Sequence, residues 1–591
     1  MRGISPDQWV YVAAPLFAYG IVVLGLAASG DAGGETNWIK AFFRSISSSL
    51  ERFTGLPGWS MAGALTGLTA SGIAVLGLYW DVAWHIDYGR DKELFTPSHV
   101  MILIGLNGLV FAAFIAVVFA TLDGARAGTR FAGLQVPWSA VAMGALGIGA
   151  VAAFPLDNLW HAAYGVDVTL WSPTHLQLIA GGSLGPMAIW LMMREGRRSA
   201  DAYPTMLGQG IEVLALGAIL TGLATFQGEF DFGVPQFQAL YHPLLIVAAG
   251  AIALVTARLA IGAGGALLAT VTFLILRGLL ALLVGDALNH TVPRFPLYVV
   301  AALGVEAVAW GLGTQPRLRF AAAAGATVAT VGLAAELAWV DLSGWGPVSF
   351  SLLPKALVLS VVVGVAAAVL GAALGQAADE TDAPSLPAGA LAGAGVALLV
   401  ALALPLPRTV GQVDAVIGLD RVGDRANVTV QLEPADAAEN ATLFGVVSWQ
   451  GGGRVSSELR RVGPGRYEST KALPVTGSWK SMVGLQRGSQ VMAAPIYLPA
   501  DPEIDASAVP ALAERRVAFS RNTDILLRES KDGPAWPALA AYFGVAVIAA
   551  LWMALLAYAT IRVRRQSPPP TPPLPPRPTT TTGWVPRHAS V

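Results

Sequence analysis

Residues 99–121 read HVMILIGLNGLVFAAFIAVVFAT and contain no Asp, Glu, Lys or Arg. A helix needs about 20 such residues to span the hydrocarbon core of a bilayer. Similar runs recur along the chain, in which 54% of the 591 residues are hydrophobic and only 13% are charged. An ordinary soluble protein carries about 25% charged residues. This composition excludes a soluble enzyme and a disordered scaffold, and it predicts a polytopic membrane protein.

Net charge and cysteine content exclude further classes of function. The formal net charge of −1 provides no basic surface for nucleic acid. The chain contains no cysteine, which excludes disulfides, thiolate metal sites, cysteine-ligated iron–sulfur clusters and cysteine nucleophiles.

Thirteen apolar spans predict the topology of a mainly α-helical bundle. They lie near residues 9–29, 60–84, 99–121, 137–160, 175–193, 206–227, 241–258, 262–285, 297–313, 320–340, 355–375, 388–405 and 537–561. The loops on one side carry fourteen Lys and Arg residues, whereas those on the other side carry five. Basic loops face the cytoplasm, so we expect an external N-terminus and a cytoplasmic C-terminus.

The spans divide the chain into four regions. Residues 1–405 are predicted to form the polytopic transmembrane domain, and residues 536–562 a C-terminal transmembrane helix. Residues 406–535, which carry 30 of the 75 charged residues, are predicted to form a domain outside the cytoplasm. Residues 563–591 are rich in proline and are predicted to be a disordered cytoplasmic tail, with docking of a tail-binding protein as an alternative role.

The extracytoplasmic domain shows the pattern of a small antiparallel β-sandwich. Alternating stretches at 427–432, 443–449 and 490–498 are broken by Gly and Pro turns. The passage from Gly463 to Tyr467 reads GPGRY, and LPVTGSW follows at 473–479. These motifs resemble the FixH/YtkA-like group of periplasmic domains. The resemblance covers about 100 residues, and it implies a role in copper handling and oxidase maturation.

A duplicated segment carries the functional signal. Residues 81–99 and 157–175 match without a gap at an offset of 76, with nine identical and three conservative positions. Each copy begins with Asp-x-x-Trp-His, continues with Tyr-Gly-x-Asp and ends in Thr-Pro-Ser-His or Ser-Pro-Thr-His. Each copy covers one helix end, one outer loop and the next helix start, so the repeat predicts two related helical hairpins.

The polar residues of the first copy predict a metal site. Asp81 and His85 are four residues apart and share one helix face. Thr96 can cap the next helix with Pro97 at its first position, which places His99 in the first turn. The positive end of the helix dipole disfavours a protonated imidazole there, and neutral imidazole is the form that binds metal. The short loop is expected to bring His99 beside Asp81 and His85.

The second copy repeats this ligand set as Asp157, His161 and His175. Six of the seven histidines fall at the outer ends of the predicted hairpins. Asp91 and Asp167, which the repeat also shares, are interpreted as loop-capping or supporting residues rather than ligands. Four residues of later outer loops are predicted as additional ligands or acid–base groups: Asp231, His242, Asp286 and His290.

Imidazole and carboxylate ligands without cysteine favour Cu(II), Zn or non-haem Fe. The spacing Asp-x3-His-x13-His resembles the Asp-x3-His-x12-His copper site in the C subunit of particulate methane and ammonia monooxygenases. The resemblance covers about twenty residues per copy. It implies copper at Asp81, His85 and His99, with a second set in the other copy. The loop is one residue longer here, and the site is duplicated.

Three functions remain open from the sequence. In the first, copper or iron at these sets makes the protein a metal-dependent oxidoreductase acting on a small or lipid-phase substrate. In the second, the protein captures metal outside and transports it inward or passes it to a redox or oxidase partner. Few polar residues beyond Arg277 continue through the spans, which disfavours a full ion path. In the third, the duplicated motif is metal-free hairpin architecture in a structural or sensory protein.

Two expectations concern the surroundings of the chain. Arg277 lies inside a predicted span and requires an ion-pair partner there, because an unpaired charge in hydrocarbon is costly. The preference for Ala, Gly, Val and Arg over Lys is typical of a high-GC bacterium. We therefore expect a multi-pass protein of a bacterial plasma membrane.

Overall fold

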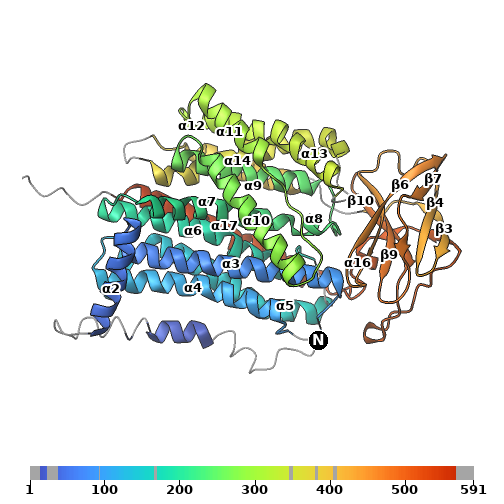
Figure 1. Ribbon diagram of the computed structural model, residues 1–591, viewed down its shortest axis with the longest axis horizontal. Coiled ribbons are helices and arrows are strands. Elements are labelled where there is room, and N and C mark those ends of the chain that lie inside the picture. Colours follow the sequence, from blue (N-terminus) through green and yellow to red (C-terminus); the bar gives the residue numbers. More distant parts are fainter. Residues whose placement is uncertain are drawn as a thin grey trace, which may run out of the picture.

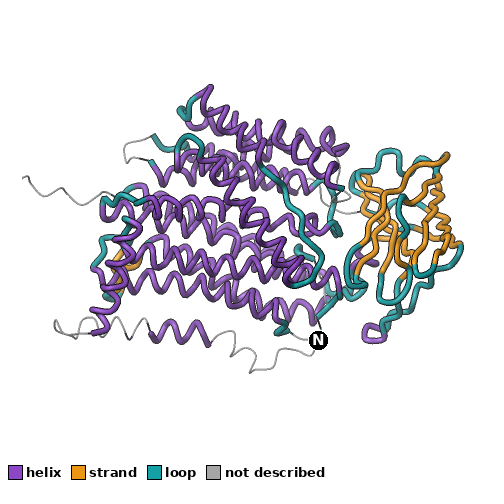
Figure 2. The backbone as a smooth tube through the Cα atoms, in the orientation of Figure 1, coloured by secondary structure: helices purple, strands orange, loops and turns teal. Residues whose placement is uncertain are grey.

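The protein consists of a bundle of long helices with a β-domain at one end of the bundle (Figure 1). Figure 2 shows that most strands lie in the β-domain, apart from a short hairpin of β1 (Thr129–Phe131) and β2 (Leu134–Val136) in the helical part. The computed structural model describes residues 14–22, 25, 38–91, 94–165, 169–344, 350–379, 384–403 and 409–566.

Among the described residues, ten helices are long and apolar enough to cross a membrane. They are α3 (Gly58–Asp87), α4 (Pro97–Asp123), α5 (Trp138–Tyr164), α6 (Pro173–Ala200), α7 continuing into α8 (Met206–Phe232), α9 (Tyr241–Ile261), α10 with the turn after it (Gly265–Ala287), α12 continuing into α13 (Arg317–Ser343), α14 with its flanking turns (Phe350–Ala378) and α17 (Ala535–Arg564). The predicted helical bundle is confirmed at this level.

Three predicted spans differ from this pattern. Helices α11 (Val299–Leu312) and α15 (Ala388–Ala403) contain 14 and 16 residues, fewer than the ~20 that a straight crossing requires. The span predicted at 9–29 lies mostly outside the described residues. The sequence analysis also missed α2 (Trp38–Thr54), which occupies a predicted loop between two spans.

Small residues let the helices of each hairpin approach closely. A Cβ atom on Gly105 of α4 would lie 2.5 Å from the backbone nitrogen of Ala74 on α3. Gly181 of α6 occupies the equivalent position in the second copy, where a Cβ atom would lie 2.8 Å from the carbonyl oxygen of Leu146 on α5. Real Cβ atoms do not approach backbone so closely, and glycine therefore sets the helix spacing that brings the ends of each hairpin together.

The β-domain is antiparallel throughout the strands that the structure describes. Its strands are β3 (Asp414–Val422), β4 (Arg425–Glu433), β5 (Leu443–Trp449), β6 (Val455–Gly463), β7 (Arg466–Ser469), β8 (Leu473–Pro474), β9 (Lys480–Arg487), β10 (Gln490–Tyr497), β11 (Glu514–Ala518) and β12 (Ser520–Arg521). They follow the order β11-β3-β4-β7-β6-β5-β9-β10-β12, and β8 pairs with β4. The strands predicted at 427–432, 443–449 and 490–498 are confirmed as β4, β5 and β10.

The buried face of the β-domain follows the alternation seen in the sequence. Along β4, Val428 and Val430 are buried whereas Asn427 and Thr429 are more exposed. These side chains share one hydrophobic cluster with Val483 of β9. The strands thus enclose a core of their own, and the division into the two layers of a sandwich stays a prediction.

The β-domain is docked on the helix ends that carry the duplicated loops. The backbone nitrogen of Gln450, after β5, donates to the carbonyl oxygen of Ile86 at the end of α3, at 2.9 Å. The nitrogen of Lys531, before α17, donates to the carbonyl oxygen of Tyr164 at the end of α5, at 2.7 Å. Both hairpins of the repeat therefore lie beneath the β-domain and its connection to α17.

Candidate metal centre

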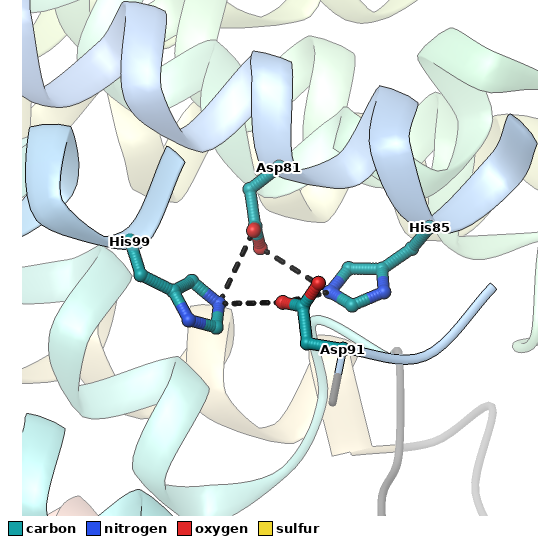
Figure 3. A group of neighbouring side chains, drawn as sticks. All are labelled: Asp81, His85, Asp91 and His99. Atoms are coloured by element: carbon teal, nitrogen blue, oxygen red, sulfur yellow. Dashed lines mark ion pairs between the residues drawn. The ribbon is translucent and has the colours of Figure 1, made fainter. Parts of the chain in front are cut away.

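The first copy of the repeat forms a compact group of four side chains, the first cluster: Asp81 and His85 on α3, Asp91 in the loop and His99 on α4 (Figure 3). His99 Nε2 lies 3.1 Å from Asp81 Oδ1 and 3.4 Å from Asp91 Oδ2. His85 Nε2 lies 3.6 Å from Asp81 Oδ2 and 3.6 Å from Asp91 Oδ2. Two imidazole nitrogens thus converge on two carboxylates.

The second copy forms the second cluster, which consists of Asp157 and His161 on α5 and His175 on α6. His161 Nε2 lies 3.1 Å from Asp157 Oδ2, and His175 Nε2 lies 3.3 Å from Asp157 Oδ1. In each cluster the ligand atoms lie within 4.8 Å of one another. Within the described part of the chain, these are the two groups of three or more His, Asp or Glu side chains that can hold a metal ion.

Helix capping places the second histidine of each cluster. Thr96 accepts a hydrogen bond from the backbone nitrogen of His99, and Pro97 opens α4. Ser172 and Pro173 take the same roles at the start of α6, where the nitrogen of His175 donates to the Ser172 hydroxyl. The predicted start of the helix after the first loop is confirmed. Each histidine is fixed by a cap that the local sequence encodes.

Backbone carbonyls face the other ring nitrogen of all four histidines. The pairs are His85 Nδ1 with Gly89 O at 2.9 Å, His99 Nδ1 with Leu94 O at 2.7 Å, His161 Nδ1 with Gly165 O at 3.1 Å and His175 Nδ1 with Thr169 O at 2.5 Å. A carbonyl oxygen only accepts, so Nδ1 carries the proton. In a neutral imidazole Nε2 is then left as a lone-pair donor. This is the second-sphere arrangement that orients metal-binding histidines.

The distances between the ligand atoms can be compared with those expected in a metal site and in an ion pair. Two atoms that each lie about 2.0–2.2 Å from one ion are roughly 2.8–3.6 Å apart for angles between 90° and the tetrahedral value. The imidazole–carboxylate distances of 3.1 to 3.6 Å lie in that range. A charge-assisted N–H···O bond is shorter, about 2.7–2.9 Å. The spacing therefore matches ligands around a shared ion, and its shortest distances of 3.1 Å also match a protonated histidine bonded to a carboxylate.

Hydroxyl groups orient the central carboxylate of each cluster. The Ser98 hydroxyl donates to Asp81 Oδ1 at 2.8 Å, and the Thr174 hydroxyl donates to Asp157 Oδ1 at 2.6 Å. These residues occupy equivalent positions of the repeat. Each bond uses one lone pair of one oxygen, so both oxygens keep electron pairs for a cation.

Asp91 belongs to the first cluster, although the sequence analysis interpreted it as a supporting residue. Its Oδ2 atom is buried without a hydrogen-bond partner and faces both histidines. Burial raises the pKa of Asp91 above its ordinary value. The repeat had offered a signal, because Asp91 and Asp167 match. Asp167 lies outside the described residues.

The two clusters line one cavity of about 60 Å³. Asp81 and His99 of the first cluster and Asp157 and His175 of the second line it together with Phe154. His99 and Phe154 meet edge to face, with ring centroids 5.9 Å apart. The room equals about two water molecules at ~30 Å³ each. A small molecule in this cavity would contact both clusters.

Four other residues predicted as ligands or acid–base groups lie outside both clusters. Asp231 is paired with Arg277, with Nη2 and Oδ2 2.7 Å apart, which identifies the ion-pair partner expected for that arginine. His290 Nδ1 lies 2.9 Å from Asp87 Oδ2. His242 is buried and stacks on Phe230, and Asp286 is exposed. None of the four lines the cavity between the clusters.

The β-domain covers the first cluster through backbone and side-chain contacts. The side chain of Gln450 donates to the carbonyl oxygen of His85 at 3.3 Å, and the nitrogen of Gly452 donates to the carbonyl oxygen of Asp87 at 3.0 Å. Arg90 in the loop binds Asp501 of the β-domain, with Nη1 and Oδ2 2.5 Å apart. The loop that carries Asp91 is thus held between the two parts of the molecule.

Comparisons of the chain with protein-family models, with curated proteins and with solved structures find no match. Function is therefore argued from the geometry of the two clusters.

Proposed function

We propose that the protein is an integral membrane metalloprotein that binds one metal ion at each of its two clusters. One observation carries the proposal: in both copies two imidazole Nε2 lone pairs point at a shared carboxylate at the spacing of ligands around one ion. Nitrogen lone pairs and carboxylate oxygens at this spacing repel one another unless a proton or a metal ion lies between them. In the third hypothesis, metal-free architecture, a proton on the histidine takes that place.

Copper is the metal we favour, with iron or zinc as alternatives. Two imidazoles with one or two carboxylates suit Cu(II), non-haem Fe and Zn, and the chain has no cysteine to select softer ions. The likeness of the Asp-x3-His-x13-His spacing to the monooxygenase copper site supports copper. Three or four protein ligands leave room for a further ligand at the ion, which a catalytic site requires.

The activity we propose is that of a metal-dependent oxidoreductase. The shared cavity supports this assignment, because it gives a small molecule simultaneous access to both clusters. A metal-handling protein that serves a partner oxidase is the second candidate. The position of the β-domain over both loops favours that reading, since metal would have to pass the domain, and so does the resemblance of this domain to the FixH/YtkA-like group.

We also propose that the clusters and the β-domain lie at the outer face of a bacterial plasma membrane. The asymmetry of Lys and Arg between the loops supports this orientation, with the N-terminus outside and the C-terminus in the cytoplasm. The proline-rich tail lies outside the described residues, and its docking to a partner stays a prediction.

Metal content measured by mass spectrometry on detergent-purified protein tests the proposal. Wild type loaded with Cu(II), Fe(II) or Zn(II) and then desalted should retain about two ions of the preferred metal per chain. His85→Ala and His161→Ala should each retain about one ion, and the double variant none, because each removes one ligand from one cluster.

The control is His290→Ala, which removes a histidine from the same end of the bundle outside both clusters. It should keep the wild-type metal content, and size-exclusion profiles should verify that all variants stay folded. Wild type that stays empty with every metal, or a double variant that binds as much as wild type, would refute the proposal.

A further inference from the structure

A second, apolar groove lies directly beside the cavity of the two clusters. Its volume is about 370 Å³, within the range of ~300–1,000 Å³ that small-molecule sites occupy. Five helices form its walls: α3, α4, α6, α7 (Met206–Ala224) and α10 (Gly265–Leu282). No Asp, Glu, Lys, Arg or His is among the residues that line it.

Four of the five hydroxyl groups that line the groove are bonded to the protein, and the fifth, that of Ser71, is buried without a hydrogen-bond partner. The Ser183 and Thr225 hydroxyls lie 2.6 Å apart, and Thr69 donates to the carbonyl oxygen of Leu65 at 3.0 Å. Thr221 donates to the carbonyl oxygen of Gly217 at 3.0 Å. A charged ligand would find no ionic partner here and a polar ligand only the Ser71 hydroxyl, whereas a hydrocarbon needs no polar partner.

The groove opens on the side of the bundle that meets lipid. Gly72 on α3 is exposed, and Leu279 on α10 keeps 53% of its surface exposed. Both helices are candidate spans, so a bilayer and not water faces this opening. The opposite wall is deep in the bundle, where Leu106 and Ile179 are 1% and 4% exposed. The groove therefore leads from the lipid phase to the interior.

The groove and the cluster cavity share one wall. Leu78, Ile102, Leu178 and Ile179 line both spaces. Ile102 lies three residues after His99, and Leu78 lies three residues before Asp81. A chain that fills the groove would thus end one side chain away from the first cluster. The small cavity beyond this wall admits the end of a chain or a small molecule and excludes a bulky headgroup.

We propose that the groove binds a neutral hydrocarbon chain taken laterally from the bilayer and presents the end of that chain to the two clusters. The proposal rests on the proposed function, because it assigns a substrate class to the same centre. Its basis is the charge-free lining, the opening to lipid and the shared wall.

Photolabelling tests the binding site directly. The full chain in lipid nanodiscs is irradiated with a linear alkane that bears a terminal diazirine, and labelled peptides are mapped by mass spectrometry. In wild type we expect labels concentrated on the groove residues of α3, α4 and α6, including the shared wall around Ile102 and Ile179.

Two matched glycine variants provide the control. A Cβ atom at Gly72 meets no atom within 4 Å, and Gly72 lines the groove, so the ring of Gly72→Phe fills it without a backbone clash. Gly278 also has no atom within 4 Å of its Cβ position, but it does not line the groove. Labelling of the groove should fall about tenfold in Gly72→Phe and stay at the wild-type level in Gly278→Phe.

The outcomes separate this inference from the proposed function. Labels spread evenly over the lipid-facing helices, or equal labelling of the two glycine variants, would refute hydrocarbon binding in the groove. This holds even if the protein binds metal. Groove labelling that Gly72→Phe abolishes would support it. If the protein also proves metal-free, the groove stands as a hydrocarbon site and the metal proposal alone fails.

Discussion

The two clusters share their ligands but differ in what surrounds them. Each has one aspartate between two histidines, a carbonyl at every Nδ1 and a hydroxyl on the carboxylate. Among the described residues, the first cluster also contains Asp91, whose counterpart Asp167 lies outside them, and it lies under a charged contact between Arg90 and the β-domain. The second lies under uncharged contacts, where the Tyr164 hydroxyl donates to the carbonyl oxygen of Pro534.

The contacts of the two clusters therefore fall into two kinds. Some were copied with the duplicated segment, and others come from residues that pack against it from elsewhere in the chain. The carbonyls and hydroxyls that orient the ligands lie within the repeated segments and were copied with them. The residues that pack over the two hairpins lie more than 300 positions further along the chain. They are Gln450 for the first hairpin and Lys531 for the second. Two sites with the same ligands can therefore acquire different affinities and different routes of access.

The largest effect on the metal affinity of the first cluster should arise from Asp91. Asp91→Asn removes an anion whose Oδ2 lies 3.4 Å from His99 Nε2. Two unit charges about 4 Å apart interact by ~4 kcal/mol at an effective dielectric constant of ~20. At ~1.4 kcal/mol per factor of ten, we expect the first cluster to lose about 100- to 1,000-fold in metal affinity, measured by competition with a chelator.

Each cluster is isolated for this measurement by disabling the other. Asp91→Asn is combined with His161→Ala to report the first cluster and with His85→Ala to report the second, which should keep its affinity. Asp286→Asn, at an exposed acid outside both clusters, is the matched control. An unchanged first cluster would return Asp91 to the supporting role that the sequence suggested.

A smaller loss of metal affinity, similar for the two clusters, is expected when the hydroxyl groups beside the central carboxylates are removed. Ser98→Ala and Thr174→Val each remove the donor that orients the central carboxylate of one cluster. Loss of such a second-sphere partner typically lowers metal affinity by about 10- to 100-fold. Each variant should weaken its own cluster in the same chelator competition. Weakening of both clusters by one variant would show that they are coupled through the shared cavity.

The smallest expected effect is on stability, and it arises from the charged contact between Arg90 and Asp501 over the first cluster. The hydrogen bond from Arg90 lowers the pKa of Asp501 below its ordinary value of about 4. The contact therefore stabilises the docked state at neutral pH, and this contribution is lost as the pH falls through the lowered pKa. Because Asp501 is partly exposed, the stabilisation should not exceed about 1 kcal/mol.

Thermal unfolding of Arg90→Met and Tyr164→Phe at pH 7 and pH 3 checks this contrast. Arg90→Met should be less stable than wild type at pH 7, and the difference should shrink at pH 3. The loss of stability in Tyr164→Phe should be the same at pH 7 and pH 3. The Tyr164 hydroxyl and the carbonyl of Pro534 do not titrate between these pH values. A deficit of Arg90→Met that is independent of pH would exclude Asp501 as its cause.

Most long helices and the two Asp/His/His sets could be predicted because each depends on local sequence. Apolar runs of sufficient length predict helices, and the Thr96-Pro97 pair predicts where α4 begins and hence where His99 lies. The helix α2 was missed because its charged face and modest apolar content resemble a loop. The short α11 and α15 were overestimated because hydropathy does not report where a helix ends.

The sequence by itself determined the two histidine–aspartate sets, since the spacing of four residues on a helix and the cap of the next helix fix them locally. Tertiary structure alone decided that both sets line one cavity, that Asp91 joins the first and that the β-domain covers both. These relations depend on helix packing and on contacts between residues far apart in the chain, such as Arg90 and Asp501. No local pattern encodes such distances, because they result from how the whole bundle packs around glycines such as Gly105 and Gly181.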